Sequence, residues 1–108
     1  MGSRTKNPAK LENPLTEARK CIEEGRYTAT YHAKVRQIER MVPLPDVLHA
    51  IENGRREKKR DRYDEAYKSW SYSIRGKATD KRDLRIVISF DEDTELLIIT
   101  VIVLGVLK

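Results

Sequence analysis

The chain of 108 residues is poor in the residues that build disulfide or metal scaffolds, with one cysteine, Cys21, and two histidines. A single cysteine excludes an internal disulfide and the paired-cysteine spacings of zinc and redox motifs. We expect Cys21 to be a small buried apolar residue. Without HExxH spacing or a glycine-rich phosphate loop, we expect neither a metal nor a cofactor.

Long hydrophobic runs are also missing. The longest lies between Leu96 and Leu107 and is interrupted by Thr100 and Gly105, whereas a helix that spans a membrane needs about 20 apolar residues. The N-terminus lacks the apolar stretch of a signal peptide. We therefore expect a cytoplasmic protein.

Charged residues are abundant, with 22 Lys and Arg against 17 Asp and Glu, which leaves a formal net charge of +5. An excess of this sign favours a polyanionic or acidic partner. Leu, Ile, Val and Phe make up about 24% of the chain, above the roughly 20% below which chains stay disordered. We expect a flexible basic tail over 1–12 and a single domain over 13–108.

Helical periodicity dominates the first half of the chain. Asn13-Pro14 is typical of a helix start, and Pro43-Leu44-Pro45 separates two later helices. The predicted elements are a helix from 13 to about 24, a brief strand over 27–31, and helices over 32–41 and 45–53. The apolar face of the helix over 32–41 consists of Tyr31, Val35, Ile38 and Val42.

Beyond Gly54 the apolar period becomes two, which is typical of strands. Predicted strands are an exposed edge strand over 55–67, one around 70–75, one over 84–90 and one over 96–104. The last is apolar on both faces, which favours a central position in the sheet. The sequence thus predicts an α+β fold, with N-terminal helices packed on a meander of about four antiparallel strands.

Three polar residues at spacings of four, His32, Arg36 and Arg40, form the sharpest constellation. They lie along one ridge of the predicted helix, beside its apolar face. An imidazole near two guanidiniums suits ribonuclease chemistry, which needs an acid or base and cations for the phosphate charge. The alternative is a solvated face on which Glu39 and Glu52 pair with the arginines.

The run from 55 to 62 carries six cations and two acids. On an edge strand its cations can follow a phosphate backbone, and equally they can protect the edge from pairing with another sheet. The cations concerned are Arg55, Arg56, Lys58, Lys59, Arg60 and Arg62.

Alternation also places Trp70 and Tyr72 on one face of a strand, where they either stack bases or face the core. Their polar neighbours then point the other way, so Arg75 and Arg85 are candidates for a basic sheet face. Thr100 is the only polar residue between Leu96 and Leu104, and a buried strand usually just tolerates such a hydroxyl.

Several short motifs occur in a fixed order: His32-Ala33-x-x-Arg36-x-x-x-Arg40-x-Val42, Asp46-Val47, Ile51, Asn53-Gly54, Leu84-Arg85-Ile86-Val87 and Ile98-Ile99-Thr100-Val101. Over about residues 27–104 they resemble a bacterial family of domains of unknown function, which is grouped with the BrnT, RelE and ParE toxins. Gln37 stands where this family usually has Met, and Met41-Val42 where it has Gly-Ile.

The resemblance implies a compact fold of two helices against a small antiparallel sheet, as in RelE and BrnT. It also implies a metal-independent endoribonuclease that binds RNA and is silenced by an acidic antitoxin. Matched residue by residue, the implied catalytic set is His32, Arg36, Arg40, Arg85 and Thr100. We expect His32 to act as general acid or base during attack of the ribose 2′-OH.

ParE-like relatives act on gyrase rather than on RNA. The alternative expectation is therefore a non-catalytic module that binds RNA or a protein target through the same basic surface. In either case Arg75, Tyr72 and the cations of the 55–62 run are the expected nucleic-acid contacts.

Overall fold

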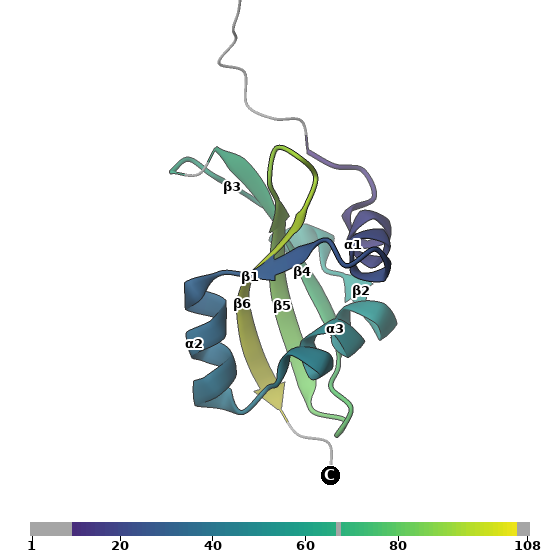
Figure 1. Ribbon diagram of the computed structural model, residues 1–108, viewed down its shortest axis with the longest axis vertical. Helices are drawn as coiled ribbons and strands as arrows, with labels where there is room; N and C mark the ends of the chain where they lie inside the picture. Colours follow the sequence, from purple (N-terminus) through teal and green to yellow (C-terminus); the bar gives the residue numbers. More distant parts are fainter. Residues whose placement is uncertain (1–9, 67, 106–108) are drawn as a thin grey trace, which may run out of the picture.

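The computed structural model describes residues 10–66 and 68–105, and it is an α+β fold as the sequence predicts (Figure 1). Its helices are α1 (Pro14–Glu23), α2 (Tyr31–Arg40), α3 (Leu44–Asn53) and a 3₁₀ turn, η1 (Lys58–Arg60). Its strands are β1 (Tyr27–Ala29), β2 (Arg55–Arg56), β3 (Arg62–Asp64), β4 (Ser69–Lys77), β5 (Asp83–Phe90) and β6 (Leu96–Gly105).

The sheet is built around the antiparallel meander β4–β5–β6, which confirms the prediction for this part of the chain. Two differences from the prediction lie at its sides. The short strand β1 pairs with β6 in parallel, through Tyr27 to Ala29, so the sheet is mixed. Because β1 covers β6 only at Leu96 to Ile98, the rest of β6 has a strand neighbour on one side only, β5.

Residues 55–66, the described part of the edge strand predicted over 55–67, do not form one strand. Two short strands, β2 and β3, each pair antiparallel with β4, and η1 lies between them. The Asp61 carboxylate follows η1 with a side chain only 2% exposed, and it forms ion pairs with Lys10 at 2.9 Å and Arg56 at 2.5 Å. These inward contacts stabilise the turn at η1, so β2 and β3 do not continue as one strand.

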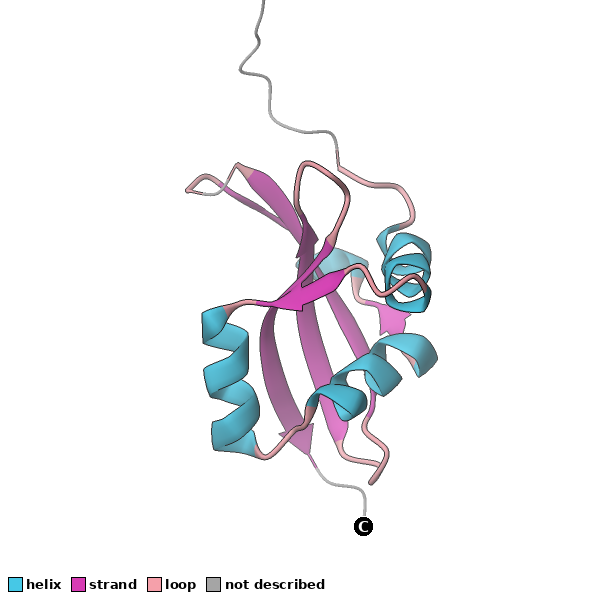
Figure 2. Ribbon diagram, viewed as in Figure 1, coloured by secondary structure: helices cyan, strands magenta, loops and turns pink. Residues whose placement is uncertain are grey.

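Helices α1 and α3 lie over one face of the sheet (Figure 2). Buried apolar side chains from β4, β5 and β6 meet them there and form the core, together with the predicted buried Cys21. The helix α3 approaches β4 most closely at Gly76, where a side chain would overlap the carbonyl oxygen of Ala50. Only glycine permits this contact between the helix and the strand.

The helix α2 packs against β6 at the side of the sheet (Figure 1), and its buried face matches the prediction only in part, since Val42 just after the helix is buried as expected. Tyr31 and Ile38, expected on its buried face, are 83% and 79% exposed. Ala33 faces inward instead, and Arg40 Nη1 donates to the Val101 carbonyl oxygen of β6. An unpaired strand edge must find hydrogen-bond donors, and this requirement outweighs the apolar stripe.

The start of α2 is tied to the same edge. Thr30 caps the helix by accepting a hydrogen bond from Ala33 N at 3.1 Å, while its own N–H donates to the Ile98 carbonyl oxygen at 3.0 Å. A threonine at this position satisfies a free donor of the first helical turn. Both ends of α2 are therefore fixed to β6.

Residues 10–12 contact the folded domain, although they were expected to belong to the tail. Leu11 N–H donates to the Tyr72 hydroxyl at 2.8 Å, and Glu12 offers its carbonyl oxygen to Arg56. The remainder of the predicted tail, residues 1–9, lies outside the described residues.

Among the described helices, none combines the length and the apolar character needed to cross a bilayer.

Substitution of Gly76→Ala should lower the free energy of unfolding by about 3 kcal/mol, because the added methyl group forces α3 away from β4. Urea unfolding followed by circular dichroism measures this. Gly105→Ala is the matched control, since a Cβ at Gly105 meets no atom within 4 Å. Equal unfolding midpoints for the two variants would contradict the close approach.

Candidate nucleic-acid interface

The face of the meander opposite α1 and α3 is polar along β4 and the middle of β5. Strand alternation sends Ile74 and Ile86 into the core, so Arg75 and Arg85 point to the other side. We call this side the uncovered face. On β6 it continues through Thr100 and Ile102, whose neighbour Val101 is buried.

Strand register brings three arginines into one row across this face. Arg55 of β2 pairs with Arg75 of β4, and Arg75 pairs with Arg85 of β5. Neighbouring strands lie about 4.8 Å apart, so the three Cα atoms are closely spaced. We call Arg55, Arg75 and Arg85 the arginine row.

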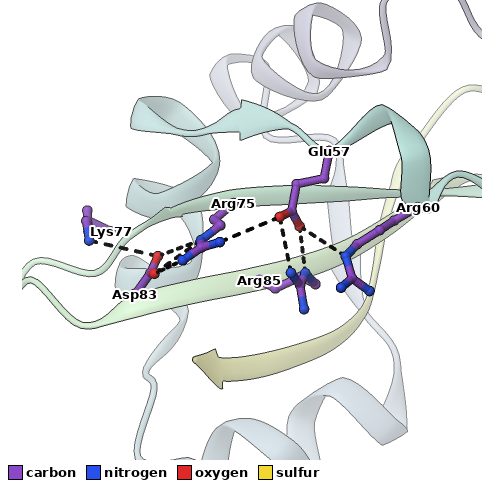
Figure 3. A network of polar contacts seen from close by, with 6 residues as sticks. All are labelled: Glu57, Arg60, Arg75, Lys77, Asp83 and Arg85. Atoms are coloured by element: carbon purple, nitrogen blue, oxygen red, sulfur yellow. Dashed lines mark hydrogen bonds and ion pairs between the residues drawn. The ribbon is translucent and has the colours of Figure 1, made fainter. Parts of the chain in front are cut away.

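Two carboxylates hold Arg75 and Arg85 of the arginine row in place (Figure 3). Arg85 donates from Nε to Glu57 Oε1 at 2.6 Å and from Nη2 to Oε2 at 3.1 Å. This is the bidentate geometry in which arginine binds carboxylates most strongly. On the other side, Arg75 donates from Nε and Nη2 to Asp83, the shorter distance being 2.5 Å.

More distant cations surround the same two acids. Glu57 lies 4.0 Å from Arg75 and 3.9 Å from Arg60, and Asp83 lies 3.9 Å from Lys77. We call these six residues the ion-pair network: Glu57, Arg60, Arg75, Lys77, Asp83 and Arg85 (Figure 3). With Arg55 added, the described cations exceed the carboxylates by five to two, so the network region keeps a formal charge of +3.

These contacts keep both acids ionised. The hydrogen bonds from Arg85 lower the pKa of Glu57, and burial opposes this shift only in part. The Arg75 guanidinium lowers the pKa of Asp83 in the same way. In return, the hydrogen bond to Glu57 raises the pKa of Arg85. Both acids therefore carry charge near neutral pH.

Four of the predicted nucleic-acid or catalytic residues come together here. Arg55, Arg60, Arg75 and Arg85 all belong to the arginine row or the ion-pair network. Thr100 lies on the same face, opposite Val87 in the β5–β6 register. Lys58, Lys59 and Arg62 are exposed on η1 and β3, beside β4.

Two other predicted contacts are turned away from the uncovered face. Tyr72 is 2% exposed and packs near Phe90, with ring centres 6.3 Å apart. Arg56 lies over the Tyr72 ring and is paired with Asp61. Their β-strand positions alternate with those of the arginine row, so both residues take part in packing and do not lie on the uncovered face.

The predicted ridge on α2 is divided among three different environments. His32 is exposed and lines a groove with Thr30, Ser71 and Ile99. Arg36 pairs with Glu39 at 2.6 Å, as the alternative interpretation expected for this arginine. Arg40 is bound to the carbonyl oxygen of Val101. The structure therefore does not gather the three side chains around one position.

Sequence reasoning missed Glu57 and Asp83, the two acids of the network. The alternation of side chains along a strand could have pointed to these two acids, because it places Asp83 on the face of Arg85 and Glu57 on the face of Arg55. Which arginine each acid binds depends on strand register, which no local pattern supplies.

Within the described part of the chain, no three His, Cys, Asp or Glu side chains group as metal ligands would.

The lowered pKa values predict acid sensitivity of the fold. In the unfolded chain Glu and Asp titrate near their ordinary values of about 4.3 and 3.9, and the folded values are lower. The network's contribution is thus complete above about pH 4.5 and is lost as the pH falls through the folded values. Urea midpoints between about pH 7 and pH 3 should therefore fall less steeply for the double variant Glu57→Gln, Asp83→Asn. Identical slopes for this variant and the parent would contradict the assignment.

Comparison with known proteins relates the chain to one family. Residues 29–103 match the family described as Domain of unknown function (DUF4258). Neither the curated proteins nor the solved structures provide a match. The match runs from the last residue of β1 through most of β6, so it contains the whole ion-pair network. The chain belongs to this family of domains of unknown function.

Proposed function

We propose that this protein is a toxin-like endoribonuclease that binds the RNA backbone across its uncovered face. The observation that carries the proposal is the arginine row, which three neighbouring strands place side by side. Phosphate oxygens suit guanidinium groups in geometry as well as in charge. The formal net charge of +5 favours the approach of a polyanion.

The ion pairs leave hydrogen-bond donors of the arginines unused. A guanidinium has five N–H donors, and the contact of Arg85 with Glu57 uses two donor nitrogens. The remaining donors are available to a phosphate that lies over the sheet. By fixing the side chains beforehand, the acids reduce the conformational entropy that binding must otherwise remove.

The cleavage part of the proposal rests on the motif resemblance. The family pattern carried by His32, Arg36 and Arg85 is grouped with the RelE and BrnT toxins, which implies attack by the ribose 2′-OH and control by an acidic antitoxin. We propose that the substrate is RNA, ribosome-associated mRNA included, and that the protein acts in the cytoplasm. An acidic antitoxin also complements the cationic surface of this chain.

A second candidate function is non-catalytic binding of RNA or of a protein target. One observation favours it: Arg40 is directed to the backbone of β6 and Arg36 to Glu39, so the two guanidiniums do not gather with His32 around one position. The binding module needs only the arginine row. Cleavage assays on the parent chain separate the two functions.

The double variant Arg55→Ala, Arg75→Ala should weaken RNA binding and reduce its salt dependence. For single-stranded RNA the slope of log affinity against log salt should fall by about 0.7 for each phosphate that the variant no longer neutralises. Fluorescence anisotropy with a labelled RNA at several salt concentrations measures this. The matched control is Lys20→Ala, because Lys20 is an exposed cation of α1, on the covered side of the sheet. Equal slopes for all three proteins would contradict the proposed RNA face.

A further inference from the structure

We propose that Glu57 is the general base of the reaction, an inference that rests on the proposed endoribonuclease function. Its carboxylate lies on the uncovered face and is 18% exposed, at the centre of the ion-pair network. Three guanidiniums surround it, those of Arg85 at 2.6 Å, Arg60 at 3.9 Å and Arg75 at 4.0 Å. No other carboxylate of the described network contacts three arginines.

Cleavage of RNA without a metal needs a proton acceptor next to groups that bind the phosphate. A carboxylate alone repels a phosphodiester, and cations alone do not accept a proton. The surroundings of Glu57 combine the two, because the arginines outnumber the acid they enclose. Each carboxylate oxygen has two lone pairs, so the bonds from Arg85 leave acceptor positions for a ribose hydroxyl.

In the proposed step, Glu57 takes the proton of the 2′-OH while the 2′-oxygen forms a bond to phosphorus and the bond from phosphorus to the 5′-oxygen breaks. The leaving 5′-oxygen takes a proton from water, and Glu57 later returns its proton to the resulting hydroxide. The products are a 2′,3′-cyclic phosphate and a 5′-hydroxyl. Arg85 and Arg75 stabilise the charge that develops on the phosphate oxygens.

The histidine predicted for this role has a different setting. His32 lines the groove that includes Thr30, Ser71 and Ile99, and the lining of this groove contains neither Glu57 nor the arginines of the network. A base must reach the hydroxyl proton of a substrate that the cations hold. Glu57 satisfies this condition through residues that contact it directly, whereas His32 is exposed at the start of α2.

The competing structural role of Glu57 is to hold Arg85 and Arg75 in place. Glu57→Gln separates the two roles, because glutamine keeps a similar shape and an acceptor oxygen for Arg85 and does not take up a proton near neutral pH. Glu23→Gln is the matched control. Glu23 is an exposed acid of α1, on the covered side of the sheet.

The experiment is single-turnover cleavage of a labelled RNA, with binding measured in parallel. We expect Glu57→Gln to slow cleavage at least about 100-fold, the usual effect of removing a general base, with RNA affinity retained. Glu23→Gln should cleave at the parental rate. Cleavage by the parent chain should persist well below pH 6.5, the ordinary histidine pKa. This pH profile requires no substitution and tests the assignment even if a variant fails to fold.

Two results would overturn the assignment of Glu57 and leave the nuclease function standing. One is cleavage at the parental rate by Glu57→Gln. The other is cleavage by the parent chain that falls with a midpoint near pH 6.5, together with loss of cleavage in His32→Ala. A third result, RNA binding by the parent chain with no cleavage under any condition, would overturn the nuclease function and the assignment together. Analysis of the product ends provides an additional check, because a 3′-phosphate formed without a cyclic intermediate contradicts attack by the 2′-OH.

Discussion

The antiparallel meander β4–β5–β6 carries α1 and α3 on one face only, and the rest of the molecule depends on this asymmetry. Successive side chains of each strand point to opposite faces of the sheet, one toward the core and the next outward. Ile74 and Ile86 stabilise the fold by burial, whereas their neighbours Arg75 and Arg85 are free to serve another purpose. The same register that aligns the core aligns the arginine row. A slip by one residue would exchange the two sets.

The polar side of this sheet contributes less to stability than the core side does. Ion pairs at partly exposed positions are worth about 0–1 kcal/mol, and Arg75 retains 36% side-chain exposure. Apolar residues there would extend the interface available to a partner or promote aggregation. Charged pairs that fix each other's rotamers instead prepare a surface for a ligand. The composition of this face supports the proposed binding role.

Local patterns predicted most elements of this fold, because helix starts and apolar periods are properties of short segments. They predicted the helix α2 itself but only part of its buried face, because Tyr31 and Ile38 are exposed and Arg40 bonds to the sheet. Donors for the β6 edge come from a helix distant in sequence, and no periodicity carries that information. The arginines of the candidate site were predicted individually. Glu57 was not, because its role arises only when β2, β4 and β5 are paired.

The position of Glu57 also links binding to chemistry. In the free protein the hydrogen bonds from Arg85 lower its pKa, which keeps it ionised and makes it a weak base. In the proposed complex, a phosphodiester bound to the remaining donors of Arg85 and Arg75 adds a negative charge beside the carboxylate. A like charge at this distance raises the pKa of a carboxylate. On this proposal the substrate increases the basicity of Glu57 as it binds, which favours proton transfer when RNA occupies the face.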